Sequence, residues 1–412
     1  MKNNTDKPLS GLRVLELSRI MAGPWAGQVL ADLGAEVIKI ERPGTGDDTR
    51  TWGPPFLKTA DGQDTRESAY YLAANRGKKS LSVDMTAPAG QTLITQLAEK
   101  SDVLIENFKV GGLVKYGLDY PALMTRHPGL IYASITGFGQ TGPNKERAGY
   151  DVMIQAMGGL MSITGEADGE PGGGPMKVGI PIVDLVTGLY TVIAIQAALR
   201  QREATGTGQH IDMALFDVQV GLLANQASNY LISGNVPQRM GSAHPNIAPY
   251  QSFATKDGHM LLAVGNDGQF AKFCKVAGHS ALAEDPRFAT NAQRVIHREE
   301  LIPLIANWMV QKTTAEWETS LGREAVPCGP INDIGEVFSQ DQIKARGLKL
   351  ELPHPASETV PMAAPPLRMD GLINHAESAP PQLGQHTQEI LRDILDMEDG
   401  KIERLTADGV IA

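Results

Sequence analysis

Leu12-Arg-Val-Leu-Glu-Leu-Ser18 and Ala35-Glu-Val-Ile-Lys-Ile-Glu41 are the two short apolar segments that decide the fold of this chain. Their length and their content of branched apolar residues predict two β-strands. The segment between them, residues 25–33, predicts a helix. A strand, a helix and a second strand in this order form a βαβ unit, so we expect the two strands to lie parallel in one sheet.

Further apolar segments continue this alternation along the first part of the chain. Residues 80–85, 102–106 and 130–135 predict three more strands, and residues 87–100 predict a helix between two of them. Strands that alternate with helices favour a parallel sheet covered by helices on both faces. We therefore predict an α/β fold whose large, Rossmann-like, doubly wound domain begins with residues 1–225.

A single acid interrupts the long apolar stretch of residues 177–200. Asp184 follows Ile180-Pro-Ile-Val183, which favours a strand, and precedes a helix that its apolar residues predict to be buried nearly all round. A carboxylate at such a junction can accept N–H bonds from the first helical turn, which keeps it ionised although apolar neighbours raise its pKa. The position suits a nucleophile, but a plain helix cap is the commoner role of Asp there.

The character of the sequence changes after this region. Residues 234–249 are rich in turn formers, and Lys256-Asp257-Gly258 separates two apolar runs, which predicts a β-hairpin. We predict that the hairpin belongs to a smaller α+β domain over residues 226–331. Residues 332–412 then form a linker and return to the large domain.

Other segments on either side of the small domain have patterns of their own. Residues 209–213 predict a strand, and residues 214–232 predict one long helix. The prolines of residues 353–366 predict an extended linker. Residues 387–397 predict a short amphipathic helix whose apolar face carries Ile390, Leu391, Ile394 and Leu395.

Composition and charge exclude several classes of protein. With 412 residues, 42% of them hydrophobic and 20% charged, the chain has the composition of a soluble globular protein. A net charge of −10 argues against nucleic acid or an anionic membrane as a partner. The first residues, Met-Lys-Asn-Asn-Thr-Asp-Lys-Pro, contain no apolar export signal, so we expect a cytoplasmic location.

The sequence also disfavours several cofactors. The turn that follows the first strand, Ser18-Arg-Ile-Met-Ala-Gly-Pro-Trp-Ala-Gly27, lacks the glycine fingerprint of dinucleotide sites. The glycine-rich segment 165–174 is acidic and lacks a following Gly-Lys-Ser/Thr, so we expect a mobile surface loop. Cys274 and Cys328 have no ligand-spaced Cys or His nearby. We therefore expect two packing cysteines, no metal and no permanently bound cofactor.

Several blocks in order resemble the class III (CaiB/BaiF) CoA-transferase family over nearly the whole chain. That family includes formyl-CoA and carnitine CoA-transferases and, as a divergent branch, α-methylacyl-CoA racemase. The blocks are Arg19-Ile-Met-Ala-Gly-Pro24, Ala31-Asp-Leu-Gly-Ala-Glu-Val-Ile-Lys-Ile-Glu-Arg-Pro43, Asn75-Arg-Gly-Lys-Lys-Ser80, Asp102-Val-Leu-Ile-Glu-Asn-Phe108, Gly149-Tyr-Asp151, Ile180 to Gly188, and Gly206-Thr-Gly-Gln-His-Ile-Asp212.

The resemblance implies a set of site residues. It places the family's nucleophilic aspartate on Asp184, and its contacts to coenzyme A on Ile20, Met21, Arg42, Val83, Asn107, Phe108 and Lys115. Arg42 and Lys115 are cations that suit the phosphates of CoA, although such residues are usually plain surface charges. The cations of Asn75-Arg-Gly-Lys-Lys-Ser80 could steer an anionic substrate or form an ordinary charged loop, and we leave them out of the site.

The resemblance also implies a reaction. In such transferases a carboxylate attacks the donor thioester, and an aspartyl anhydride and an aspartyl-CoA thioester follow. The racemase branch instead uses a His where this chain has Tyr150, and a phenol is a poor base at neutral pH, so transfer is favoured. A CoA-binding protein without turnover remains an alternative. Tyr150 and Asp151 are expected to shape the pocket near Asp184.

The identity of the two substrates and the assembly are implied only by the resemblance. The block Gly241-Ser-Ala-His-Pro-Asn-Ile-Ala-Pro249 places His244 where it could face an acceptor carboxylate. Residues 234–250 lack the tetraglycine lid of formyl-CoA transferases. Acyl-CoA and a small carboxylic acid are the expected partners. Succinyl-CoA with a dicarboxylate is the favoured pair. The family also implies an interlocked homodimer.

Overall fold

The computed structural model describes residues 7–369 and 375–412, which form two compact units. The large unit comprises Met1–Gly159, Val178–Ala227 and Asp341–Ala412, and the small unit comprises Leu160–Lys177 and Ser228–Gln340. This division differs from the sequence-based boundaries, since residues 160–177 belong to the small unit and the return begins at Asp341. Residues 1–6, part of the segment used to judge an export signal, lie outside the described residues.

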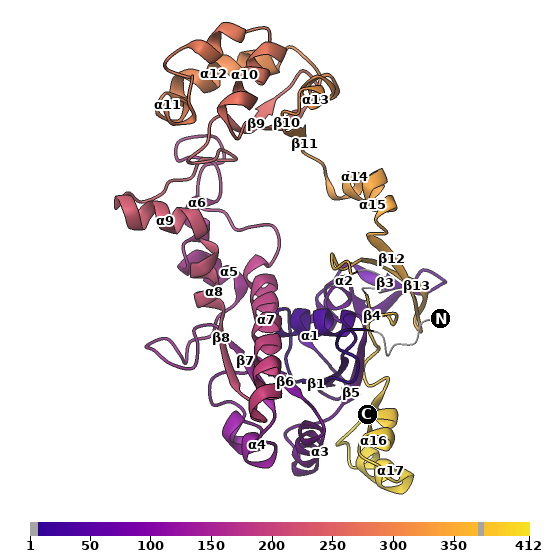
Figure 1. The fold of residues 1–412 in the computed structure, drawn as a ribbon. Coiled ribbons are helices and arrows are strands. Elements are labelled where there is room, and N and C mark those ends of the chain that lie inside the picture. Colours follow the sequence, from indigo (N-terminus) through magenta and orange to yellow (C-terminus); the bar gives the residue numbers. More distant parts are fainter. Residues whose placement is uncertain (1–6, 370–374) are drawn as a thin grey trace. The chain divides into compact units, whose positions relative to one another are not determined.

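A six-stranded parallel sheet forms the centre of the large unit, as the sequence predicts (Figure 1). Its strands are β1 (Arg13–Glu16), β2 (Glu36–Glu41), β5 (Lys78–Ser82), β6 (Val103–Glu106), β7 (Ile131–Thr136) and β8 (His210–Ala214). All five pairings are parallel, and the order is β5-β2-β1-β6-β7-β8. This is the doubly wound order, and its direction reverses between β1 and β6.

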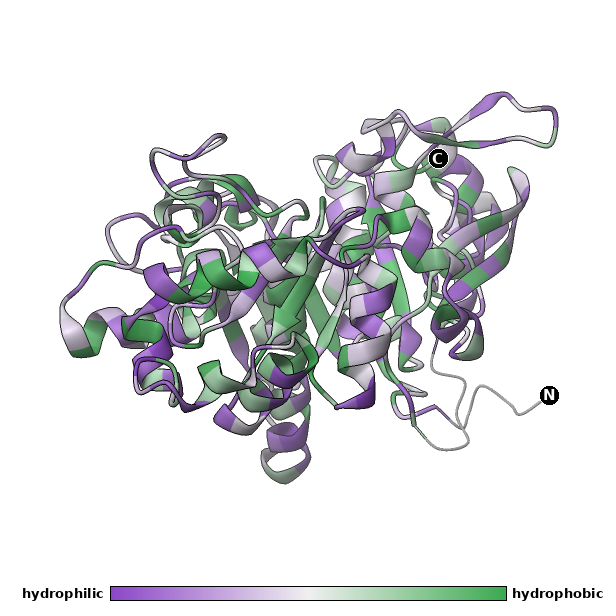
Figure 2. Ribbon diagram, turned by 90° about the horizontal axis from the view of Figure 1, so that it is seen from above, coloured by the Kyte–Doolittle hydropathy of each residue, from purple (hydrophilic) through white to green (hydrophobic). Residues whose placement is uncertain are grey.

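Helices pack on both faces of this sheet because adjacent strand residues point to opposite sides. Val14 and Val37 pack on one side with α1 (Ala22–Asp32) and α7 (Ile182–Thr205). Leu15 and Ile38 pack on the other side. The helices there are α3 (Pro88–Glu99), α4 (Tyr120–Arg126), α16 (Thr387–Asp393) and α17 (Asp399–Ala407). The strands between the two layers are strongly apolar in Figure 2, as expected for a parallel sheet covered on both faces.

The α7 helix differs from the sequence prediction in two respects. Residues 180 and 181 are irregular and the helix begins at Ile182, so the predicted strand before Asp184 is absent. The prediction of a helix buried nearly all round is also wrong, because Leu189, Tyr190 and Ile193 are 43%, 49% and 61% exposed. By length and composition α7 could cross a membrane, but the core helix of a soluble protein passes the same test.

The chain after β8 forms two helices instead of the single one predicted. They are α8 (Leu215–Leu222) and α9 (Ala224–Ser233). Ala224 has a φ of 44°, in the left-handed region that a continuous right-handed helix cannot contain. Smaller elements precede β8. Those of the large unit are η2 (Asp48–Thr51), β3 (Phe56–Lys58), β4 (Asp64–Ser68), α2 (Ala69–Leu72), η3 (Val114–Tyr116) and α5 (Asp151–Met157), and α6 (Leu160–Ile163) belongs to the small unit.

The small unit contains the predicted hairpin, β9 (Tyr250–Ala254) and β10 (His259–Ala263), extended by β11 (Cys328–Pro330) into a three-stranded antiparallel sheet. Its helices are α10 (Asp267–Val276), η4 (Ser280–Glu284), α11 (Asn291–Ile296), α12 (Arg298–Met309), α13 (Thr314–Arg323) and α14 (Ile334–Ser339). Cys274 is fully buried in their apolar core and Cys328 packs against it, and both are free. The cysteines are packing residues, as predicted.

The return to the large unit is more regular than the sequence indicates. After α15 (Asp341–Ala345), β12 (Lys349–His354) and β13 (Ser357–Ala363) form an antiparallel hairpin where we predicted an extended linker. The prediction was wrong because proline is tolerated in edge strands. Pro353 and Pro361 lie in the paired strands of a two-stranded sheet, in which each strand has a free edge. The predicted C-terminal helix ends earlier, at Asp393, and Ile390, Leu391 and Ile394 are buried as expected.

Candidate active site

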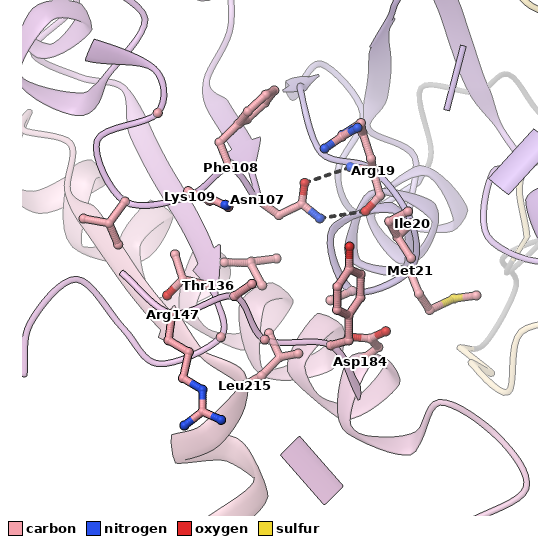
Figure 3. A pocket seen from close by; sticks show the side chains of 18 of the residues that line it. Arg19, Ile20, Met21, Asn107, Phe108, Lys109, Thr136, Arg147, Asp184 and Leu215 are labelled. Atoms are coloured by element: carbon pink, nitrogen blue, oxygen red, sulfur yellow. Dashed lines mark hydrogen bonds between the residues drawn. The ribbon is translucent and has the colours of Figure 1, made fainter. Parts of the chain in front are cut away.

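A cavity of about 420 Å³ opens where the sheet order reverses (Figure 3). The turn after β1 supplies Ile20 and Met21, the turn after β6 supplies Asn107 and Phe108, and α7 supplies Asp184. Open parallel sheets bind ligands at this point because the turns on the two sides diverge and leave a crevice. The fold therefore brings six of the sequence-predicted site residues, these five and Tyr150, to one cavity.

Asp184 is the third residue of α7 and is 9% exposed. Burial, followed by the nearby charge of Asp151, raises the pKa of its carboxyl group from 3.8 to about 7. Burial disfavours the ionised form, and a second carboxylate adds repulsion. The group therefore gains and loses its proton near neutral pH, which is typical of functional carboxylates in clefts.

Asp151, rather than Asp184, satisfies the start of α7. Its Oδ2 accepts hydrogen bonds from the backbone N–H groups of Val183 at 2.8 Å and Asp184 at 3.2 Å. Pro181 occupies the helix-capping position, so the alternative of Asp184 as an N-cap is wrong. We also expected the Asp184 side chain to accept N–H bonds from the first turn of α7, but the Val183 and Asp184 N–H groups donate to Asp151. The Asp184 carboxyl group forms part of the cavity wall instead.

The side chain of Asn107 ties the two turns together. Its Oδ1 accepts the Arg19 N–H at 2.9 Å, and its Nδ2 donates to the Arg19 carbonyl at 2.7 Å, the two dashed lines in Figure 3. The amide is thus engaged with the backbone across the crevice. Asn107 fixes the wall of the cavity, while Ile20, Met21 and Phe108 supply its surface.

A second cavity of about 140 Å³ adjoins the first and shares Arg19 and Phe108 with it. Arg42 and Val83 line this smaller cavity, together with Tyr116. Lys115 lies beside it, with its ammonium nitrogen 4.7 Å from the centre of the Tyr116 ring. The residues that the resemblance implies for CoA are therefore distributed over two adjacent cavities.

The two remaining predicted residues, Tyr150 and His244, lie in different units of the chain. Tyr150 lines the first cavity, is 59% exposed and precedes α5, which begins at Asp151. His244 belongs to the small unit, where its Nδ1 accepts the backbone N–H of Asn246 at 3.1 Å. An acceptor at Nδ1 leaves Nε2 as the protonated nitrogen of the neutral ring. The role of His244 beside Asp184 stays a prediction.

Tyr70 lies near the site without lining either cavity, and the sequence analysis missed it. Burial raises the pKa of its phenol to about 12, and the charges of Asp184, Asp151 and Asp47 add to the shift, which places the phenol near the two site carboxylates. Trp52 packs edge-on against it with ring centres 5.1 Å apart. Tyr70 lies in the short helix α2 and Trp52 directly follows η2, both outside the motifs, so no periodic pattern pointed to them.

The cations that lie at the cavity differ from those that the sequence analysis considered. Arg76 forms a buried ion pair with Asp32 at 2.7 Å, and Lys78 one with Glu16 at 2.8 Å. Neither can steer a ligand from the surface, so this possibility is wrong for both. The first cavity is instead lined by four other cations, Arg19, Lys109, Lys145 and Arg147.

Comparison with known proteins assigns the chain to a family. A family model described as CoA-transferase family III matches residues 9–387. The chain belongs to CoA-transferase family III. It is 50% identical over 395 residues to the succinate–glutarate CoA-transferase of Agrobacterium fabrum, covering 96% of this chain and 98% of that relative. It is 43% identical over 408 residues to the human succinyl-CoA:glutarate CoA-transferase, covering 99% and 91%.

A solved structure agrees with this assignment. The crystal structure of a CAIB/BAIF family protein from Brucella suis is 50% identical, has a TM-score of 0.82, and the match covers 94% of this chain and 99% of that one. The resemblance identified from the sequence motifs is confirmed. The protein is a class III CoA-transferase, and CoA thioesters are its substrates.

Proposed function

We propose that this family III CoA-transferase moves CoA from succinyl-CoA to glutarate or a similar short dicarboxylate, with Asp184 carrying the CoA between the two acids. The observation that supports this most strongly is the buried Asp184 carboxyl in the wall of the first cavity. The names of the Agrobacterium fabrum and human relatives supply the substrate pair.

In the proposed mechanism, an Asp184 oxygen attacks the donor thioester carbonyl, the C–S bond breaks, and CoA leaves as a thiolate. The thiolate then attacks the Asp184 carbonyl of the mixed anhydride, which releases the donor acid and leaves an aspartyl-CoA thioester. An acceptor carboxylate attacks this thioester and expels the thiolate again. The thiolate takes the acyl group of the new anhydride, which frees the Asp184 carboxylate and forms the product thioester.

Burial of Asp184 fits this sequence of steps. A carboxylate with little hydration is more reactive toward a carbonyl, and a site that excludes water protects the anhydride from hydrolysis. The two cavities are adjacent and share Arg19 and Phe108, so we place the acyl end of the thioester in the first cavity and the nucleotide end in the second. Arg42 and Lys115 then face the phosphates, and Tyr150 borders the acyl end.

The pH dependence of the first half-reaction follows from the pKa of Asp184, which is about 7. Only the ionised form attacks, so kcat/KM for succinyl-CoA should fall as the pH drops below 7. Asp151→Asn removes the neighbouring charge but keeps an oxygen that can accept the Val183 and Asp184 N–H bonds. We expect the acid limb of the pH profile to move to lower pH. A profile that stays in place would contradict the role given to the Asp151 charge.

A transfer assay tests the substrate pair. The protein is incubated with succinyl-CoA and glutarate, and glutaryl-CoA is followed by liquid chromatography. We expect glutaryl-CoA to form in step with the loss of succinyl-CoA, and none to form when glutarate is omitted. Absence of transfer, combined with solvent deuterium at an α-carbon of a branched acyl-CoA, would instead indicate the racemase chemistry.

We further propose that the protein works in the cytoplasm as an interlocked homodimer. The resemblance supplies this assembly, and the exposed apolar side chains of two helices are consistent with it. Ile193 on α7 is 61% exposed, and Leu231 and Ile232 on α9 are 79% and 87% exposed. Surfaces of this kind are usually covered by a partner. Light scattering of the full chain distinguishes a dimer from a monomer.

A further inference from the structure

The turn after β1 contains an unusual backbone conformation at Ile20. Its φ is 73°, in the left-handed region that β-branched residues rarely occupy. Such strain persists only where the surrounding structure enforces it, and it gathers at functional sites. Ile20 lines the first cavity, so its backbone sets the position of a surface that the substrate would meet.

The carboxylate of Asp47 is the group that contacts this backbone. Both of its oxygens accept the Ile20 N–H, each at 3.3 Å. The same carboxylate caps η2, accepting the Thr49 N–H at 3.0 Å and the Thr49 hydroxyl at 2.8 Å. Asp47 is 1% exposed, so these bonds form away from water. One buried group therefore connects the strained residue to a second structural element.

A chain of alternating charges holds Asp47 from behind. Lys39 places its Nζ 2.9 Å from Asp47 Oδ2 and 3.0 Å from Glu16 Oε1, and Lys78 follows on the other side of Glu16 at 2.8 Å. All four side chains are buried. The Lys39 Nζ also donates to the Ser18 carbonyl at 2.9 Å, within the same turn as Ile20. Lys39 and Asp47 also line the second cavity, whereas Glu16 and Lys78 line neither of the two cavities.

These charges keep Asp47 ionised. Burial would raise its pKa, but Lys39 and the Thr49 hydrogen bonds lower it below the ordinary value of 3.8. A carboxylate accepts N–H bonds more strongly than a neutral amide oxygen does. The turn is thus held by a charged acceptor on the Ile20 side and by the Asn107 amide on the Arg19 side.

We propose that Asp47 is a positioning residue for CoA transfer, which holds Ile20 in its left-handed conformation and so shapes the cavity wall that receives the acyl-CoA. The inference rests on the proposed function to the extent that it places acyl-CoA in this cavity. Its action is on substrate binding, because Asp47 acts through Ile20 and leaves the chemistry to Asp184.

The test is a double-mutant cycle in steady-state kinetics. Asp47→Asn weakens the acceptor, so KM for the donor acyl-CoA should rise about tenfold, as expected for the loss of a charged hydrogen bond, while kcat changes less than about twofold. Ile20→Gly removes the need for the restraint, because glycine adopts positive φ freely. In Ile20→Gly/Asp47→Asn, KM should therefore return to within about threefold of Ile20→Gly alone.

Controls separate positioning from a general loss of stability. Glu36→Gln removes another carboxylate that forms ion pairs. Glu36 begins β2, pairs with Arg13 and Lys79 and lines neither cavity, so KM should not change. If Asp47→Asn alone does not fold, the Ile20→Gly/Asp47→Asn variant tests the positioning role instead. A folded double variant with a KM near that of Ile20→Gly supports the proposal. An unfolded double variant, or additive losses in the cycle, would overturn it.

Binding of free CoA by calorimetry distinguishes this proposal from the proposed function. If the protein binds CoA but transfers none, the proposed function fails while the Asp47 cycle can still be measured in Kd. If transfer occurs and neither KM nor Kd responds to Asp47→Asn, the positioning role fails and the proposed function stands.

Discussion

Asp184→Asn lowers kcat/KM for CoA transfer by about 10⁴-fold or more, because a neutral amide oxygen cannot attack the thioester or carry the CoA. The variant keeps the size and shape of the side chain, so the cavity should keep its form. The loss should appear in kcat, and CoA binding should stay within about threefold of the wild type. The assay is initial-rate kinetics with succinyl-CoA and glutarate.

Stability provides an independent measurement on the same variant. The folded-state pKa of Asp184 is about 7, above its ordinary value of 3.8, so the folded protein binds a proton that the unfolded chain has lost between these pH values. Unfolding free energy therefore decreases as the pH rises through this range, and the full loss is present above pH 7. Asp184→Asn has no ionisable group at this position and therefore does not lose this unfolding free energy as the pH rises. At pH 8 its thermal midpoint should equal or exceed that of the wild type.

Asp399→Asn is the matched control for both measurements. Asp399 is another first-turn aspartate of the large unit, exposed at the start of α17 and paired with Arg392 on the surface. We expect its activity and stability to stay close to wild type, since exposed ion pairs contribute little. Substantial transfer by Asp184→Asn would exclude Asp184 as the carrier of CoA.

Gly188→Val is expected to have the largest effect on stability. A Cβ at Gly188 would lie 2.7 Å from the Ala22 carbonyl oxygen and 3.1 Å from the Trp25 ring, so α7 must move away from α1. Overpacking of this kind costs about 2–3 kcal/mol. Asp184 lies one turn earlier in α7, and a displacement of about 1 Å costs on the order of 10²-fold in rate. Thermal unfolding and kcat measure the two effects.

Gly400→Ala serves as the control for this substitution. Gly400 lies in α17 with open space where a Cβ would be, so alanine should leave the thermal midpoint and kcat unchanged or slightly raise the midpoint. A Gly188→Val protein with wild-type stability and kcat would show that the approach of α1 and α7 does not position Asp184.

The sequence predicted the features that depend on local patterns. Short apolar runs gave the parallel strands, and the reversal between β1 and β6 follows from the doubly wound order. The turn residues Ile20, Met21, Asn107 and Phe108 were implied by the resemblance, and they meet at one cavity because the carboxyl ends of neighbouring parallel strands share an edge. Asp184 was recognisable as a lone acid in an apolar stretch.

Features that depend on distant contacts could not be predicted in this way. Asp151 takes the first-turn N–H groups of α7 from a separate segment, so Asp184 looked like its own cap. Tyr70, whose phenol is influenced by the charges of the carboxylates, lies in a four-residue helix that is too short to show a periodic pattern. The cations Arg76 and Lys78 resembled a surface loop because their buried partners, Asp32 and Glu16, lie in other elements.

The most direct measurement of the central claim is mass spectrometry of the covalent intermediate. The protein is incubated with succinyl-CoA, quenched and digested, and the peptide that carries Asp184 is examined. We predict a CoA or succinyl adduct on that peptide, absent in Asp184→Asn and present in Asp399→Asn. No adduct at Asp184 with succinyl-CoA or with several other acyl-CoAs, from protein that turns these substrates over, would contradict transfer through this carboxylate.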